Sequence, residues 1–285
     1  MEGKELKALV SLLDDEDEQI LSHVESKIIS LGNEVIPFLE EEWENAFNPV
    51  VQKRIEELVH ILQYDQLKMR LAEWKEKSSD DLLMGMWLIC TYQYPDLEYE
   101  KLKQDFEQLY YEVWLEFKPD IHPYDQVKIL NSVLFNKLKF RANTKNFHSP
   151  GNSMINTVLE TKKGNPITLC VIYMLVAQKL KLPISGVNLP NLFILTYKGD
   201  KQTQFYINAF NRGLIFLKED IDNYISELRL TPNDTYYQPC TNEEIIRRAL
   251  RNLSVSFEKI GDHARSDEVK VLLHTLSDGP DLGEI

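Results

Sequence analysis

The chain has 285 residues, of which 43% are hydrophobic, and its formal net charge at pH 7 is −13. Apolar residues spread along the whole length are sufficient for a packed core, which excludes a wholly disordered chain. The acidic balance disfavours nucleic acid as a partner, because a negative surface repels phosphate backbones.

The sequence shows no sign of a membrane or secretory protein. No stretch approaches the roughly 18 consecutive apolar residues that a membrane-spanning helix needs, and the N-terminus lacks the basic and apolar blocks of a signal peptide. The three cysteines, Cys90, Cys170 and Cys240, lie far apart. Their odd number argues against a disulfide framework. We therefore expect a cytoplasmic protein with no membrane contact.

Residues 1–118 are predicted to form a helical region. Apolar residues recur at helical spacing, and Gly32 is suited to end the second helix as a C-cap. An Asp-rich turn, a helix, Leu31-Gly32 and then Val35–Leu39 together resemble a HEAT-type unit, whose paired helices must stack to bury their apolar faces. Further helices are expected at 50–62, 65–75, 80–91 and 99–117.

Residues 119–232 are predicted to mix helices and strands. Helices are expected at 127–138, 154–160 and 166–180, and the last is apolar nearly all round, as is typical of a buried helix. Strand-like segments then follow one another with turns between them, which indicates an antiparallel meander. The expected strands are 184–187, 192–197, 204–209 and 214–216.

Residues 233–285 are predicted to form a helical tail. Thr241 and Glu244 have the spacing of a capping box, and an apolar face follows them. A second helix is expected at 266–276. The whole chain is thus predicted to be an α+β protein in three parts.

Six motifs of the middle region carry a family resemblance. Their order and spacing over about 125–217 resemble those of SirB-type transglutaminase-like proteins, and the tail at 243–253 is similar to the tetratricopeptide-like extension of that family. The resemblance implies a papain- or transglutaminase-like core, in which a buried helix packs on a small antiparallel sheet. The motifs are Leu130–Arg141, Asn152-Ser153, Gly164–Leu169, Leu182-Pro183, Gly186–Pro190 and Ile207–Asn211.

The same resemblance implies that the catalytic triad is missing. A cysteine nucleophile is activated at a helix N-terminus by a histidine, which an aspartate orients. On these motifs the cysteine position falls on Pro166, the histidine position on Leu192 and the aspartate position on Asn208. Proline cannot act as a nucleophile and leucine cannot accept a proton. An asparagine can orient an imidazole, but no imidazole stands at the histidine position. We therefore predict a degenerate, non-catalytic member of the family.

Cys170 and His148 offer an alternative. Cys170 lies one turn after Pro166 on roughly the same helix face, and His148 precedes Ser149-Pro150. A cysteine-dependent hydrolase or acyltransferase could use these two residues with Asn208 in a rearranged site. The apolar neighbours of Cys170 favour a buried structural thiol instead.

Other site classes find little support. The histidines are scattered without metal-ligand spacing, and no glycine-rich phosphate loop occurs, so we expect neither a metal nor a cofactor. Asn188, Asn191, Asn208 and Asn211 are candidate residues for the lining of the former active-site cleft, which could hold a peptide or a small polar ligand.

Two further clusters are candidates for binding. Aromatic residues gather between 87 and 117, where helical spacing also fits a core role. A small basic face that could hold an acidic peptide or an anion is formed by Arg247, Arg248, Arg251 and Lys259. We predict a module that binds a protein, a peptide or a second copy of itself. A third hypothesis is a regulatory scaffold in which the helical flanks act and the core is a spacer.

Overall fold

The computed structural model describes residues 3–199 and 203–277 and confirms an α+β fold. The chain folds into two compact units, residues 1–70 and 71–285. The predicted domain limits at 118 and 232 are a separate, sequence-based division and stay a prediction. Within the described residues, no helix combines the length and the apolar character needed to cross a membrane.

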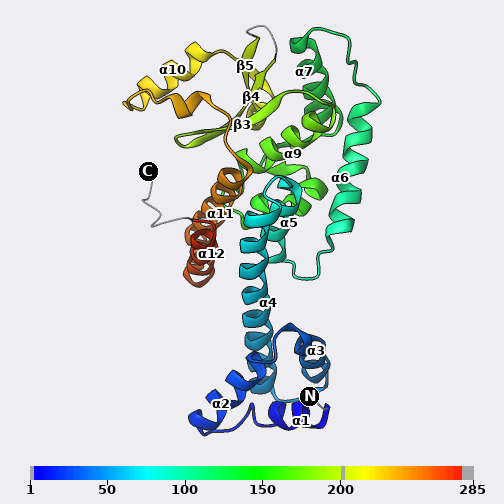
Figure 1. Cartoon of the computed structure of the whole chain (residues 1–285), viewed down its shortest axis with the longest axis vertical. Helices are drawn as coiled ribbons and strands as arrows, with labels where there is room; N and C mark the ends of the chain where they lie inside the picture. Colours follow the sequence, from blue (N-terminus) through cyan, green and yellow to red (C-terminus); the bar gives the residue numbers. More distant parts are fainter. Residues whose placement is uncertain (1–2, 200–202, 278–285) are drawn as a thin grey trace. The chain divides into compact units, whose positions relative to one another are not determined.

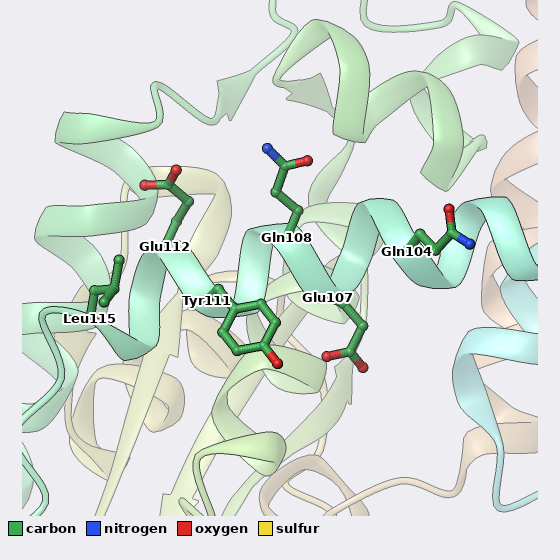
Figure 2. Close-up of a pocket in the computed structure, with 6 residues that line it drawn as sticks. All are labelled: Gln104, Glu107, Gln108, Tyr111, Glu112 and Leu115. Atoms are coloured by element: carbon green, nitrogen blue, oxygen red, sulfur yellow. The ribbon is translucent and has the colours of Figure 1, made fainter.

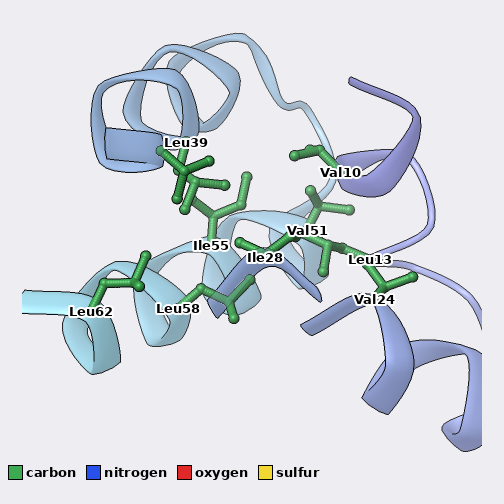
Figure 3. Close-up of a cluster of buried hydrophobic side chains, with 10 residues drawn as sticks. Val10, Leu13, Val24, Ile28, Leu39, Val51, Ile55, Leu58 and Leu62 are labelled. Atoms are coloured by element: carbon green, nitrogen blue, oxygen red, sulfur yellow. The ribbon is translucent and has the colours of Figure 1, made fainter. Parts of the chain in front are cut away.

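The first unit is helical (Figure 1). Its buried aliphatic side chains form one cluster, in which Leu13, Ile28 and Leu39 are completely buried (Figure 3). Asp17 caps the second helix by accepting a hydrogen bond from the Gln19 backbone N–H at 2.8 Å. The elements are α1 (Gly3–Val10), α2 (Glu18–Ile29), η1 (Asn33–Val35), α3 (Ile36–Asn45) and the first part of α4 (Pro49–Lys77).

Helix α4 corrects one prediction. The sequence predicts a break between 62 and 65, but α4 is continuous from Pro49 to Lys77. No proline or glycine interrupts it, and Asp65, the expected helix start, instead pairs with Lys68 one turn later at 2.7 Å. An acidic residue inside a helix therefore resembles a capping signal.

The second unit contains the core around which the candidate site is built. Helix α9 (Pro166–Lys179) packs against a four-stranded antiparallel meander (Figure 1). Ten of its side chains are buried, as its apolar sequence predicts. The predicted strand order is confirmed. The strands are β3 (Ile184–Leu189), β4 (Leu192–Lys198), β5 (Gln204–Asn208) and β6 (Leu214–Phe216).

The two faces of the sheet are covered by different elements. Helix α10 (Lys218–Glu227), which the sequence analysis missed, packs Ile221 and Ile225 on Val187, Ile194 and Tyr206. Side chains alternate between faces along a strand. The intervening buried residues therefore face the opposite side, where α9 packs.

The remaining elements of this unit are mainly helical. The helix predicted from 127 to 138 is instead α7 (Pro123–Asn131) followed by a π-helix, η2 (Ser132–Lys137). In the π-helix each N–H pairs with the carbonyl five residues earlier, as Leu138 N–H does with Val133 O at 2.8 Å. The Thr241 capping box is confirmed at the start of α11. The other elements are α5 (Leu82–Thr91), α6 (Tyr99–Trp114), α7 (Pro123–Asn131), η2 (Ser132–Lys137), β1 (Arg141–Ala142), η3 (Pro150–Ser153), α8 (Ile155–Thr161), β2 (Lys163–Gly164), η4 (Ala209–Asn211), η5 (Asp234–Tyr237), α11 (Asn242–Lys259) and α12 (His263–Thr275).

Candidate functional site

The N-terminus of α9 is the position at which this fold would place a nucleophile. Pro166 is the first helical residue, where its missing N–H costs nothing. Asn165 is the N-cap: its Oδ1 accepts from the Thr168 backbone N–H at 2.9 Å, and its Nδ2 donates to Ser153 Oγ at 2.9 Å. Asn165 is only 6% exposed. The helix end is thus occupied by a structural cap and a chemically inert ring.

A second asparagine fixes the loop beside this helix end. Asn152 is buried and donates through Nδ2 to the carbonyl oxygens of Asn146 at 2.7 Å and Phe147 at 2.9 Å. Its Oδ1 accepts from Asn143 Nδ2 at 2.7 Å. The Asn165 backbone N–H donates to the Asn152 carbonyl at 3.3 Å, which ties the loop to the helix. These amides hold residues 143–153 against the start of α9.

Cys170 lies in the core below this cap. Its side chain is completely buried, and Sγ donates a weak hydrogen bond to the Phe193 carbonyl oxygen at 3.5 Å. Burial raises the pKa of the Cys170 thiol to about 12, because an apolar environment disfavours the thiolate. The thiol is therefore neutral near pH 7, and a neutral thiol is a poor nucleophile.

His148 is not brought to Cys170 as a base. It is exposed in the loop before η3, with its ring edge-on to Phe147 at a centroid distance of 5.1 Å. Besides burial, the groups that act on the pKa of Cys170 are the Ala209 backbone and Cys240, and not His148. Phe147 also packs edge-on against Phe210 of η4, at 6.1 Å.

Leu192 and Asn208 have structural roles where they stand. Leu192 opens β4 opposite Leu189, and its side chain packs in the apolar cluster under α10. Asn208 ends β5, and its Oδ1 accepts from the Asn211 backbone N–H at 3.1 Å, which caps η4. Neither side chain can exchange a proton with a thiol.

The four asparagines suggested as a cleft lining do not share one surface. Asn188 is paired with Phe193 of β4. Leu195, two residues later in β4 and on the same face as Phe193, is paired with Ile207 of β5. Paired residues share a face and successive residues alternate, so Asn188 and Asn208 lie on opposite faces of the sheet. Asn191 and Asn211 are exposed in the segments that follow β3 and β5. The structure thus separates Asn188 from Asn208.

The sequence reasoning missed the asparagine network as part of the site. From the sequence alone, Asn143 marks a loop, Asn152 and Ser153 form a motif, and Asn165 is a cap. The signal that could have found the network is the density of asparagines just before a buried helix, because buried amides need partners and commonly cross-link loops.

A surface feature lies on the outer side of α6. Tyr111, Trp114 and Leu115 are 58%, 53% and 71% exposed, and their spacing places them on one side of the helix. We call these three side chains the α6 ridge. A depression of about 360 Å³ lies along it (Figure 2), lined by Gln104, Glu107, Gln108, Tyr111, Glu112 and Leu115.

A second depression, of about 520 Å³, continues the α6 ridge toward the end of α9. Leu115 lines both depressions. Lys179 lies at the rim, with Nζ 4.6 Å from the centre of the Tyr110 ring and paired with Glu107. The side chains that line this second depression are Tyr110, Trp114, Leu115, Phe117, Pro119, Lys179, Leu180 and Lys181.

No group of three or more histidine, cysteine, aspartate or glutamate side chains is placed to hold a metal ion within residues 3–199 and 203–277. The three thiols are free, with Cys90 and Cys170 buried and Cys240 partly buried. The polar groups near the start of α9 are amides, hydroxyls and one neutral thiol.

Comparison with known proteins identifies the family. The family model of the transglutaminase-like superfamily matches residues 100–251, more than half of the chain. The chain therefore belongs to the transglutaminase-like superfamily, in agreement with a buried helix on an antiparallel sheet.

Relatives among curated proteins extend this result. A UPF0162 protein of Xylella fastidiosa strain 9a5c is 31% identical over 179 residues, which cover 60% of this chain and 63% of that protein. A UPF0162 protein of strain Temecula1 is 37% identical over 133 residues, or 46% and 47% of the two chains. F-box only protein 21 of Mus musculus is 33% identical over 91 residues, or 30% of this chain and 14% of the relative.

The chain thus spans about half to under two thirds of the length of the first two of these relatives. No solved structure matches this chain significantly.

Proposed function

We propose that this chain is a degenerate, SirB-type member of the superfamily that binds a protein or peptide and does not catalyse acyl transfer. The observation that carries the proposal is the start of α9, where Pro166 stands behind a buried amide cap and the thiol of the helix, Cys170, is completely buried. Acyl transfer through cysteine needs a thiolate that the substrate can reach. Neither condition is met by the described side chains there.

The electrostatics of Cys170 support the same proposal. A catalytic cysteine beside an imidazolium has a lowered pKa, whereas the pKa of Cys170 is raised to about 12 by burial. Moving its sulfur to the surface would require α9 to separate from β4, because Sγ already contacts the Phe193 carbonyl. The alternative enzyme, which uses Cys170, His148 and Asn208, would need that rearrangement.

The α6 ridge supports the binding half of the proposal. Contiguous exposed aromatic and aliphatic side chains are enriched at protein-binding hot spots, where Trp and Tyr contribute most. The ridge presents Tyr111 and Trp114 beside two depressions that an apolar side chain of a partner could enter. The charged side chains of the depressions, Glu107 and Glu112 in the first and Lys179 and Lys181 in the second, would form the polar rim.

The comparisons are compatible with a modular role. The segment shared with F-box only protein 21 is 14% of that relative's length, so a related segment occurs there within a much longer chain. We propose a cytoplasmic location and three functional parts, residues 1–118, 119–232 and 233–285. Deletion of 1–118 would distinguish binding by the core from a scaffold that acts through its helical flanks.

The absence of catalysis is testable with the full chain. Wild type and Cys170→Ala are incubated with a glutamine peptide and dansylcadaverine, and separately with p-nitrophenyl acetate. We expect the two proteins to give the same background rates. A covalent acyl-enzyme or turnover that disappears in Cys170→Ala would overturn the proposal.

The binding surface is tested with a phage-displayed peptide library selected on the wild-type chain. Selected peptides should carry an apolar anchor and lose at least about 10-fold in affinity for Trp114→Ala, as hot-spot residues do. Val271→Ala on α12, which removes a side chain that is 47% exposed, is the matched control and should bind normally. Peptides that bind wild type and Trp114→Ala equally would remove the α6 ridge from the proposal.

A further inference from the structure

Arg248 occupies an unusual position between α11 and the sheet. Its guanidinium is partly buried, and Nη1 donates to Asn188 Oδ1 on β3 at 3.1 Å. Among the described residues, Asn188 is the hydrogen-bond partner of the Arg248 side chain. Nearby, the Tyr224 hydroxyl on α10 donates to the Pro190 carbonyl oxygen at 2.8 Å. Three elements thus meet around one cation.

The charges around Arg248 are unfavourable for a buried cation. Burial lowers its pKa most, the positive charge of Arg251 lowers it further, and Tyr224 acts in the opposite direction. In the part of the chain that the structure describes, no carboxylate contributes to this balance. A partly buried cation beside a like charge is costly unless an anion compensates it.

Two acidic side chains, Glu244 on α11 and Asp222 on α10, are engaged in other contacts. Glu244, one helical turn before Arg248, accepts from the Thr241 backbone N–H at 2.6 Å and closes the capping box. Asp222 on α10 accepts from the Tyr237 hydroxyl at 2.5 Å and is paired with Lys218. Both carboxylates already have donors, so neither is available to Arg248 without loss of a local structural bond.

We propose that Arg248, with the charge of Arg251 beside it, binds an oxyanion, either a carboxylate or a phosphate group. A guanidinium has five N–H donors in a planar fork that matches two oxygens of such a group. The Asn188 amide fixes the fork at one edge, and its remaining edge can accept the ligand. The site lies beside Pro190, where the β3–β4 connection turns, and Asn188 extends from the face of the sheet that α9 covers.

This proposal does not depend on the absence of catalysis. It concerns two arginines of α11, Arg248 and Arg251, and it would stand if the core proved to be an enzyme. It also accounts for a basic cluster on a protein whose net charge is −13.

The test uses the full chain and two probes, inorganic phosphate and N-acetylglutamate, each compared with chloride at equal ionic strength. Melting temperature and calorimetric titration should show saturable binding of at least one probe in wild type. Arg248→Gln should weaken that binding at least 10-fold, and Arg251→Gln several-fold while it keeps the Arg248–Asn188 bond. Arg265→Gln, which removes an exposed arginine paired with Asp262, is the matched control and should bind as wild type.

The two probes separate the possible sources of the anion. Preference for N-acetylglutamate would indicate an acidic peptide side chain, and preference for phosphate would indicate a phosphorylated ligand. In chloride alone, Arg248→Gln should melt no lower than wild type, because it removes a like-charge repulsion. Binding that does not saturate, or that is equal in wild type, Arg248→Gln and Arg251→Gln, would overturn the proposal.

Discussion

Alkylation of Cys170 directly tests whether the core keeps this thiol buried and protonated. The pKa of this thiol is raised from 9.0 to about 12, a difference of about three units. Below both values, three units lower the thiolate fraction by about 1000-fold, and the thiolate is the reactive form. Complete burial adds a second barrier, because iodoacetamide must wait for a local opening. We therefore expect Cys170 to react at least about 1000 times more slowly than free cysteine at pH 8.

The assay is a time course with iodoacetamide, read by mass spectrometry of proteolytic peptides that contain each of the three cysteines. In native protein, Cys90 and Cys170 should remain unmodified long after free cysteine is consumed, since both are fully buried. In urea all three should react at similar rates, which is the internal control. A native rate for Cys170 within 10-fold of free cysteine would refute the argument, and a rate above it would indicate an activated nucleophile.

Three further predictions concern stability, each measured by urea unfolding. Asn165→Ala should cost about 2–4 kcal/mol, because it removes an N-cap and leaves the buried Ser153 hydroxyl without a donor; Asn165→Ser keeps the capping oxygen and should cost less, and equal losses would contradict this account. Gly85→Ala should destabilise by about 1–3 kcal/mol despite better helix propensity, since the new Cβ would lie 2.8 Å from the Trp74 ring; a gain in stability would show that the ring moves freely. The pKa of Cys170 is raised from 9.0 to about 12, so its contribution to stability is complete below pH 9 and is lost as pH rises toward about 12. Cys170→Ala should therefore flatten the alkaline decline in stability by up to about 1.4 kcal/mol per pH unit between pH 9 and 11. Parallel declines of wild type and Cys170→Ala would refute it.

The amino-acid sequence by itself determined the elements of the core and their type. A helix without a polar face predicts burial of α9, and period-2 patterning with intervening turns predicts the meander from β3 to β6. The Thr241 capping box marks the start of α11. These features are local: hydrophobic period, capping residues and turn residues are written in consecutive positions.

Only the tertiary structure determined which side chains share a face of the sheet and which contact one another. Local sequence cannot specify that Asn188 and Asn208 lie on opposite sides of the sheet, because this follows from the register between strands. Nor could it predict that Asn152 and Asn165 would join a loop to a helix start, since their partners come from separate segments. The environments of Cys170 and Arg248 arise in the same way, because burial and neighbouring charge depend on residues brought together only when the chain folds.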